Sequence, residues 1–453
     1  MAQEHKAAEF TGPGQDFAVV GTGVAGMSAA WLLADRHKVT VYEREGRVGG
    51  HSHTVEAHTP RGTVPVDTGF IVYNEPNYPN LTALFSHLGV KTESSNMSFS
   101  VSLDGGAMEY AGGTYGGLLA QPSCLFRADY LAMLRDIVRF YREAPDLLAE
   151  REDANMSLGD YLRLEKYSDG FARLHLLPMG AAIWSSSLDD MMRHPLRAFV
   201  RFFQNHGLFK FFNRPQWQTV SGGSREYVKA LTARYADKIS VGNGVRAIER
   251  DAFGVTIIDS NGQSRRHDGV IIAAHADQAL GMLAKPSYEE SALLGAFGYR
   301  PNLAVLHSDR ALMPKRRMAW ASWNYIGQSD TDANADLCVT YWMNRLQNID
   351  RRTPMFLTLN PAAAPRDETI YGTYEYSHPM FNKAALNAQQ RLWTLQGVNR
   401  TWYAGSYFGS GFHEDALQAG LAAAEDAGQV RRPWQVAKEN GRIVLAPQLA
   451  RAG

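Results

Sequence analysis

The residues whose types and spacing promise chemistry begin with three glycines, Gly21, Gly23 and Gly26, in a Gly-x-Gly-x-x-Gly pattern. Such a pattern provides a tight turn, exposed backbone N–H groups and close helix packing, all of which a pyrophosphate group requires. Glu43 follows about 20 residues further on, where a carboxylate can accept hydrogen bonds from both ribose hydroxyls. The spacing therefore predicts a dinucleotide-binding site.

The segments around this pattern must form the elements that hold it in place. Residues 17–20 are an apolar run typical of a buried parallel strand, residues 27–35 have helical spacing, and residues 38–42 are a second β-branched run. The order strand, glycine turn, helix, strand, acid predicts a Rossmann-like βαβ unit whose helix N-terminus faces the phosphates. We therefore predict an α/β fold class (α+β over the whole chain) with a parallel sheet.

A second glycine-rich segment, residues 47–54, reads Arg-Val-Gly-Gly-His-Ser-His-Thr. It resembles the flavin amine oxidase, phytoene desaturase and protoporphyrinogen oxidase superfamily, in which such a segment wraps the pyrophosphate of FAD. The glycine pair adds N–H donors, and Arg47 adds a fixed cation. The resemblance implies FAD as the cofactor, and no second Gly-x-Gly-x-x-Gly pattern for NADPH follows in the sequence.

The resemblance continues through most of the chain, although Ser406 stands where the superfamily usually has an acid. Further matching segments are residues 217–224, 239–248, 270–275 and 401–415. The helix expected at residues 416–425 would direct its N-terminus at the flavin and stabilise negative charge there. The cofactor-binding residues predicted in this way are Gly21, Gly23, Val24, Ala25, Gly26, Glu43, Arg44, Arg47, Gly49, Gly50, His51, Ser52, Thr68, Gly69, Phe70, Val245, Ala273, Ala274, Gly405, Ser406, Asp415 and Ala416.

The resemblance also implies a discontinuous domain organisation. The FAD-binding domain is expected at residues 16–94, 215–285 and 401–430, and a substrate domain of mixed sheet and helices at residues 95–214 and 286–400. A disordered arm at residues 1–15 and a C-terminal tail at residues 431–453 complete the predicted chain.

Four residues are candidates for catalysis: His413 and Glu414 beside the expected flavin, and Tyr376 and His378 in the substrate domain. An imidazole at His413 could move protons near neutral pH. Glu414 and Asp415 also stand at a helix start, where carboxylates serve as caps. For His378 a non-catalytic role is an equal alternative.

Two further groups of residues bear on the chemistry. His51 and His53, spaced i, i+2 without other ligands, predict no metal site. The loop of residues 67–74 follows the pyrophosphate motif and is expected to line the flavin. The aromatic pair that commonly forms an amine-binding cage is not evident, although Tyr407 and Phe408 are near enough to replace it.

Within the superfamily, the motifs at residues 49–54, 66–74 and 409–415 resemble a bacterial branch of predicted NAD/FAD-binding proteins. Members of that branch are often encoded beside enzymes similar to cyclopropane-fatty-acyl-phospholipid synthases. This implies a small-molecule or lipid acyl substrate and a neighbouring lipid-modifying enzyme as partner. We expect an FAD-dependent oxidoreductase that desaturates or isomerises an unsaturated, methyl-branched or cyclopropane fatty acyl chain by hydride transfer to flavin N5. Two alternatives stay open: a flavin amine oxidase that releases hydrogen peroxide, and a non-catalytic flavin-binding partner of a lipid-modifying enzyme.

A stretch rich in phenylalanine and cations, residues 196–212, has two interpretations. It is either an interfacial helix through which an acyl chain enters from a membrane, or a helix packed on the core with snorkelling cations. Lys+Arg and Asp+Glu are equal at 46 each, which gives no reason to expect nucleic acid as a partner. With two cysteines, no signal segment and no apolar run long enough to span a membrane, we expect a cytoplasmic protein. Peripheral contact with the inner face of the membrane stays open.

Overall fold

The computed structural model describes residues 14–113, 115–150, 156–210, 213–328 and 337–445. The chain folds into two compact units, each built from separated segments. Unit 1 comprises Met1–Gly50, Val228–Ala296 and Ala388–Gly453, and unit 2 comprises His51–Tyr227 and Phe297–Asn387. Residues 51–94 and 215–227, which the sequence analysis assigned to the FAD-binding domain, thus belong to unit 2. The predicted N-terminal arm lies outside the described residues as far as residue 13.

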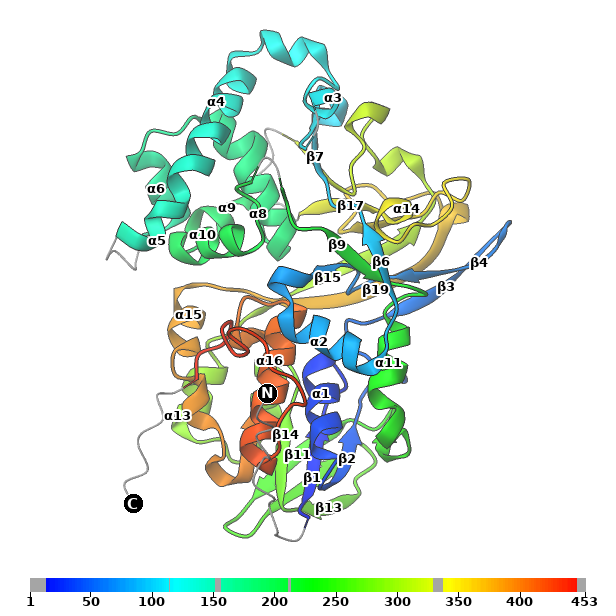
Figure 1. Ribbon diagram of the computed structural model, residues 1–453, viewed down its shortest axis with the longest axis vertical. Coiled ribbons are helices and arrows are strands. Elements are labelled where there is room, and N and C mark those ends of the chain that lie inside the picture. Colours follow the sequence, from blue (N-terminus) through cyan, green and yellow to red (C-terminus); the bar gives the residue numbers. More distant parts are fainter. Residues whose placement is uncertain (1–13, 114, 151–155, 211–212, 329–336, 446–453) are drawn as a thin grey trace, which may run out of the picture. The chain divides into compact units, whose positions relative to one another are not determined.

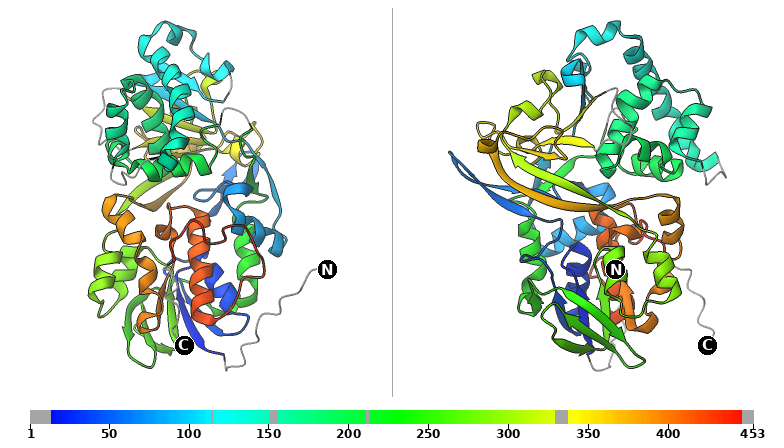
Figure 2. Two further views of the ribbon diagram at one scale, coloured as in Figure 1. Left: turned by 60° about the vertical axis from the view of Figure 1, so that its left-hand side comes forward. Right: turned by 180° about the vertical axis from the view of Figure 1, so that it is seen from behind.

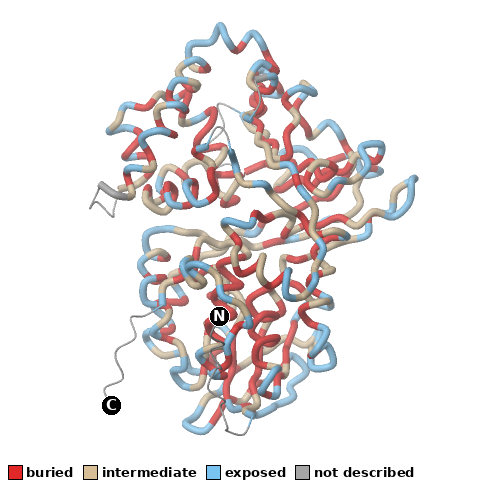
Figure 3. The backbone as a smooth tube through the Cα atoms, viewed as in Figure 1, coloured by how far each residue is buried: buried red, intermediate tan, exposed pale blue. Residues whose placement is uncertain are grey.

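The centre of unit 1 is a five-stranded parallel sheet (Figure 1). Its order is β10 (Ile239–Ser240), β2 (Lys38–Tyr42), β1 (Asp16–Val20), β14 (Gly269–Ile272) and β20 (Thr401–Tyr403). Val19 lies in register with Val41 on one side and Ile271 on the other, and all three side chains are fully buried. In Figure 3 the buried backbone, in red, gathers in the interior of this unit. Burial on both faces explains why these strands are continuous apolar runs. The predicted fold class is confirmed.

Two helices lie side by side on this sheet, α1 (Val24–Leu33) and α16 (His413–Gly428) (Figure 1). A Cβ added at Gly420 of α16 would lie 2.2 Å from the carbonyl oxygen of Ala25 on α1. The two helices therefore approach each other more closely than any side chain at this position would allow. Unit 1 also holds an antiparallel sheet of β11 (Val245–Arg250), β12 (Val255–Asp259) and β13 (Ser264–His267), and the helices α12 (Ala276–Met282) and α13 (Tyr288–Leu294).

The segment predicted as a C-terminal tail packs on unit 1 as far as it is described, to residue 445. Trp434 stacks on Trp31 of α1 with 5.8 Å between ring centroids. The buried Arg432 donates to the carboxylate of Glu425 at 2.8 Å. This segment thus packs on the unit through a few residues, and most of its other described residues are exposed or half-buried.

Unit 2 is built on a seven-stranded mixed sheet, in which only β16 and β7 pair in parallel among the neighbouring described strands. Its order is β19 (Ile370–Pro379), β15 (Tyr299–His307), β18 (Phe356–Leu359), β17 (Cys338–Trp342), β16 (Trp323–Gly327), β7 (Phe99–Leu103) and β8 (Met108–Ala111). Smaller elements are the hairpin of β3 (Thr54–Thr59) and β4 (Gly62–Asp67), and a sheet of β5 (Tyr73–Asn74), β9 (Trp217–Val220) and β6 (Thr92–Ser95). Several predicted site residues of unit 2 lie on or next to β3, β4 and β19.

The helices of unit 2 gather beside its sheet, as the two views of Figure 2 show. They include α4 (Ala128–Glu143), α6 (Leu158–Leu164), α8 (Leu177–Trp184), α9 (Leu188–Arg193) and α10 (Leu196–Asn205). The helix α10 contains most of the phenylalanine-rich stretch, of which residues 211–212 lie outside the described residues.

The phenylalanines of α10 face inward. Phe199 and Phe203 are fully buried and stack with 4.1 Å between ring centroids, and Phe202 packs against Trp184 at 4.7 Å. Arg201 projects to the surface. The core-packed interpretation therefore holds for this helix, and its buried rings are not placed to enter a membrane. None of the helices in the described ranges is long and apolar enough to cross a bilayer.

Candidate active site

In the glycine loop of unit 1, Gly21 and Gly26 face backbone atoms, whereas Gly23 faces open space. Gly21 has φ +97°, and a Cβ there would lie 2.6 Å from the carbonyl oxygen of Ala273. A Cβ at Gly26 would lie 2.0 Å from the carbonyl oxygen of Gly21. At Gly23, which caps the N-terminus of α1, an added Cβ would have no described atom within 4 Å. The free N-terminus of this helix thus faces open space, which suits an approaching pyrophosphate.

Glu43 is tied to this loop. Its Oε2 accepts the backbone N–H of Thr22 at 2.8 Å and also the hydroxyl of Thr22, and its Oε1 accepts the N–H of Glu45 at 2.8 Å. A carboxylate has about four acceptor sites, so this one retains capacity for a ribose hydroxyl. The neighbouring Arg44 is exposed and pairs with Glu45 at 3.4 Å.

The second glycine segment lies against the first. The N–H of Gly49 donates to the carbonyl of Thr22 at 3.2 Å, and a Cβ at Gly50, where φ is +57°, would lie 2.9 Å from the Cα of Gly23. Arg47 Nη1 is buried and has no hydrogen-bond partner in the described part of the chain. A buried cationic donor without an acceptor is costly. The donor set therefore fits the FAD diphosphate, which would supply that acceptor.

The remaining cofactor residues predicted in unit 1 lie at strand ends. Ala273 and Ala274 follow β14, Gly405 and Ser406 follow β20, and the half-buried Val245 begins β11. In the Rossmann arrangement, ligands bind beyond the carboxyl ends of parallel strands. The four residues after β14 and β20 stand at those ends.

Asp415 acts as a cap at the start of α16. Its Oδ2 accepts the N–H groups of Ser410 at 2.9 Å and Phe412 at 2.8 Å, and its Oδ1 lies 2.7 Å from Nε of Arg442. Burial raises the pKa of Asp415, against the opposing effect of Arg442. The capping interpretation thus describes its contacts, and Ala416 follows it in the same turn.

The two catalytic candidates on α16 are held within its first turns. Glu414 is fully buried and accepts a hydrogen bond from Nε2 of Gln418 at 2.9 Å. Burial lowers the pKa of His413 to about 3. Burial therefore favours the neutral form of the His413 imidazole, and its role in proton transfer, considered from the sequence, stays a prediction.

The two candidates on β19 meet residues from the start of unit 2. The hydroxyl of Tyr376 is hydrogen-bonded to Thr68 Oγ1 at 2.6 Å and to His53 Nδ1 at 3.0 Å. The ring of His51 lies 5.1 Å from that of Tyr376 and 5.4 Å from that of His378. We call these five residues, His51, His53, Thr68, Tyr376 and His378, the β19 cluster. It joins both predicted catalytic residues of the substrate domain to two predicted cofactor residues.

Three contributors were not predicted as site residues. His53 bonds Tyr376 directly, Tyr374 packs edge-on against His53 at 5.1 Å, and the amide of Asn302 donates to His378 Nδ1 at 3.3 Å. The alternation of residues 374, 376 and 378 along one strand face was a usable signal. The pairing of β15 with β19, which brings in Asn302, has no signal in the sequence.

The other predicted cofactor residues of unit 2 support this cluster. A Cβ at Gly69 would lie 2.2 Å from the carbonyl oxygen of His51, and the N–H of Phe70 donates to that oxygen at 2.7 Å. The hydroxyl of Ser52 is hydrogen-bonded to that of Tyr227. Through these contacts, residues 68–70 lie next to residues 51–53.

A buried carboxyl, Asp67, lies next to the cluster in sequence. Its Oδ1 accepts the hydroxyls of Thr54 at 2.6 Å and Ser224 at 2.7 Å, and its Oδ2 accepts Nε2 of Gln347 at 2.8 Å. Burial outweighs these hydrogen bonds and raises the pKa of Asp67 to about 6. This group therefore titrates close to neutral pH.

The aromatic pair considered as an amine cage does not have that geometry. Tyr407 and Phe408 are 1% and 2% exposed, and their rings are tilted by 43° with 5.0 Å between centroids. A cage around a cation needs two open ring faces. These two rings instead fill the core of unit 1.

The parallel sheet with its open glycine loop defines a dinucleotide-binding protein of the Rossmann class. The sequence model of the family described as flavin containing amine oxidoreductase matches residues 24–345. The chain therefore belongs to this family of FAD-dependent oxidoreductases, and its cofactor is FAD.

Individual proteins extend the comparison. AofH of Mycobacterium tuberculosis, which carries the name of a flavin-containing monoamine oxidase, is 29% identical over 269 residues, covering 57% of this chain. The chain spans only 56% of the length of that relative. Cyclohexylamine oxidase from Brevibacterium oxydans matches with a TM-score of 0.66 at 16% identity, and a CLA-producing fatty acid isomerase from P. acnes with 0.65 at 15%. Both matches cover 92% of this chain and 99% of the other, and they show the shared fold.

Proposed function

We propose that this protein desaturates or isomerises an unsaturated, methyl-branched or cyclopropane fatty acyl chain. The observation that carries the proposal is the β19 cluster. Its groups are imidazoles, a phenol and a hydroxyl, a set suited to moving a proton at a neutral hydrocarbon. An ammonium substrate would instead favour a carboxylate or open aromatic faces as its immediate partner.

FAD supplies a two-electron hydride acceptor when it is bound. Desaturation removes a hydride and a proton from neighbouring carbons, so residues of this chain must take the proton. The hydroxyl of Tyr376, 3.0 Å from His53 Nδ1 and 2.6 Å from Thr68 Oγ1, can accept a proton while it releases its own to His53. An isomerisation has no net loss of electrons, so the hydride would also have to return to the acyl chain, and the same relay would return the proton to a different carbon.

The fold is compatible with acyl chemistry, because a protein described as a fatty acid isomerase shares it. An amine oxidase is the second candidate function, favoured by the family match and by the similarity to AofH. The arrangement of Tyr407 and Phe408 argues against an amine oxidase, because the two rings are buried and tilted and leave no open faces for an amine. The two functions predict different products.

Product analysis tests the proposal. FAD-loaded protein is incubated with a phospholipid that carries monounsaturated or methyl-branched chains, and the released fatty acids are analysed by mass. We expect a loss of two hydrogens per chain for desaturation, or an unchanged mass with a displaced double bond for isomerisation. Conversion of a primary amine with release of hydrogen peroxide, while the acyl chains stay unchanged, would support the amine oxidase instead. Inertness toward both substrates would favour the non-catalytic flavin-binding partner.

A further inference from the structure

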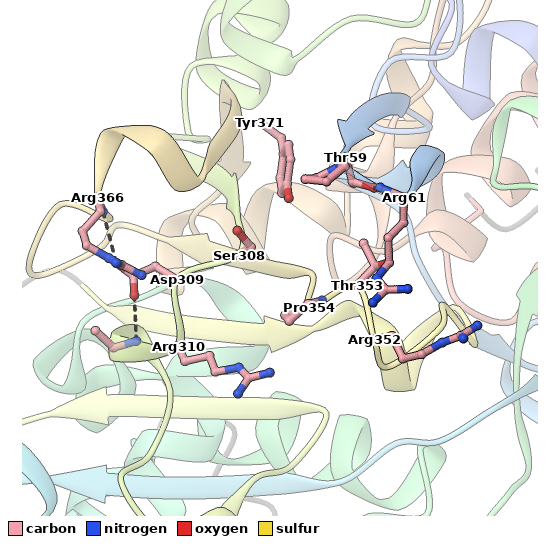
Figure 4. Close-up of a pocket in the computed structure, with 12 residues that line it drawn as sticks. Thr59, Arg61, Ser308, Asp309, Arg310, Arg352, Thr353, Pro354, Arg366 and Tyr371 are labelled. Carbon is pink, nitrogen blue, oxygen red and sulfur yellow. Dashed lines mark hydrogen bonds and ion pairs between the residues drawn. The ribbon is translucent and has the colours of Figure 1, made fainter.

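Unit 2 contains a cavity of about 670 Å³ at a place that the β19 cluster does not reach (Figure 4). Its lining includes four arginines, Arg61, Arg310, Arg352 and Arg366, and one acidic residue, Asp309. In Figure 4 the side chains of Arg61 and Arg352 lie on one side of the cavity and those of Arg310 and Arg366 on the other. Positive charge thus surrounds the cavity, although the chain as a whole has a net charge of zero.

Sheet register brings these arginines together from distant parts of the sequence. His307 at the end of β15 pairs with Phe356 at the start of β18 and with Ile370 at the start of β19. The loops beyond these strand ends carry Arg310, Arg352 and Arg366, and the β3–β4 hairpin adds Arg61. Because antiparallel pairing fixes this meeting point, the arrangement is a property of the fold.

Two of the four arginines are held in ion pairs, and the other two are not. Arg366 Nε donates to Asp309 Oδ2 at 3.1 Å, and Arg352 Nη2 donates to Asp350 Oδ2 at 2.6 Å. The guanidinium groups of Arg61 and Arg310 make no hydrogen bond or ion pair within the residues that the structure describes. Asp350 lies close enough to Arg61 for their charges to attract, but neither Arg61 nor Arg310 is held in an ion pair among the described residues. Two such cations on one concave surface raise the local concentration of an anionic ligand.

Further cations near the cavity also favour the binding of an anion. Arg317, just beyond the cavity lining, packs its guanidinium over the ring of Trp320 at 3.7 Å. Burial lowers the pKa of Arg317, and repulsion from Arg310 and Arg351 lowers it further. Cations thus crowd this end of the sheet, and a bound anion would relieve their repulsion.

We propose that this cavity is a phosphate-binding site. Guanidinium groups present parallel N–H donors that match two oxygens of a phosphate, which makes arginine the residue of choice for this group. Tyr371 and Ser308, which also line the cavity, carry hydroxyl groups that can donate to further oxygens.

Two sources share this chemistry: free phosphate and the head group of a phospholipid. Tyr371 at the cavity and Tyr376 in the β19 cluster stand five positions apart on β19, about 17 Å along an extended strand. Five is an odd number of positions, so in a regular strand the two side chains would point to opposite faces of β19, and this distance alone does not connect a head group in the cavity with the cluster. Only this second source rests on the proposed function.

Calorimetric titration of the FAD-loaded protein with inorganic phosphate, at constant ionic strength, is the first arm of the test. FAD occupies its own diphosphate site, so that site does not contribute to the signal. The test variant is Arg61→Gln/Arg310→Gln, and the matched control is Arg142→Gln/Arg201→Gln, which removes two exposed arginines from helices of unit 2. We expect at least tenfold weaker phosphate binding in the test variant and unchanged binding in the control.

Cosedimentation with phosphatidylglycerol vesicles is the second arm. Vesicle binding that the test variant loses and the control retains identifies a lipid head group, whereas phosphate binding without vesicle binding identifies free phosphate. Both support the site. Equal behaviour of wild type, test variant and control in both arms would overturn the proposal. Retained FAD absorbance and an unchanged unfolding temperature report that the variants fold, as expected for side chains that make no ion pair.

Discussion

The glycine loop of unit 1 and the β19 cluster of unit 2 are built in opposite ways. The loop is made of backbone from nearby segments: a Cβ at Gly26 would lie 2.0 Å from Gly21, and one at Gly50 would lie 2.9 Å from Gly23. The cluster is made of side chains from residues 51, 53, 68, 376 and 378. Cofactor binding in this chain therefore depends on positions that have no side chain. The proposed chemistry depends instead on side chains that the fold brings together from distant parts of the sequence. The four predictions below test that contrast, beginning with the largest effect.

The largest effect is expected from Gly26→Ala. The new methyl group would lie 2.0 Å from the carbonyl oxygen of Gly21, and backbone atoms cannot move aside as a flexible side chain would. We expect a loss of about 3 kcal/mol or more in the free energy of unfolding, together with loss of bound FAD. Urea unfolding and flavin absorbance measure both. The control is Gly46→Ala, where the methyl group meets no described atom within 4 Å; equal stability of the two variants would contradict the account.

Asp67 provides a pH-dependent test in unit 2. Burial raises its pKa from 3.8 to about 6. Since the folded state then holds the proton more tightly than the unfolded state, the stability that Asp67 contributes is present at low pH and is lost as pH rises through about 6. A difference of this size corresponds to about 3 kcal/mol. The free energy of unfolding of wild type, taken relative to that of Asp67→Asn, should therefore fall by most of that amount between pH 4 and pH 7. A relative free energy that is constant or rises across this range would show that Asp67 is ionised at the usual pH.

Tyr376→Phe removes the shared hydroxyl of the β19 cluster and keeps the ring. We expect turnover to fall about a hundredfold, as for the loss of a group that transfers protons, while FAD stays bound. Tyr288→Phe is the matched control, because that tyrosine is 84% exposed in unit 1. Steady-state rates and flavin absorbance separate the two effects. Loss of FAD together with activity would instead assign Tyr376 to cofactor binding.

The smallest effect is expected from Arg47→Gln. The buried Nη1 donor has no partner in the described residues, so a diphosphate is its natural acceptor. One charge-assisted hydrogen bond is worth enough to weaken FAD binding about tenfold. Fluorescence titration of the apoprotein with FAD measures this, with the exposed Arg36→Gln as control. Unchanged affinity in Arg47→Gln would remove this arginine from the diphosphate site.

The same contrast explains what the sequence could predict. The βαβ unit and the glycine turn depend on residues close in sequence, and local patterns encode them. The close approach of Ala273 to Gly21 comes from a distant strand. The meeting of His53 with Tyr376 depends on the long-range placement of β19, which no local pattern encodes. The phenylalanine-rich helix α10 shows a related limit, since amphipathic spacing alone does not say whether a protein core or a membrane covers the apolar face.

An anaerobic titration of the FAD-loaded protein tests the central claim most directly. The visible flavin spectrum of wild type and Tyr376→Phe is recorded as phospholipid with unsaturated or methyl-branched chains is added, and separately as a primary amine is added. For a desaturase the account predicts that lipid bleaches the flavin in wild type, that bleaching is about a hundredfold slower in Tyr376→Phe, and that the amine has no effect. Bleaching by the amine alone, at the same rate in both proteins, would contradict it.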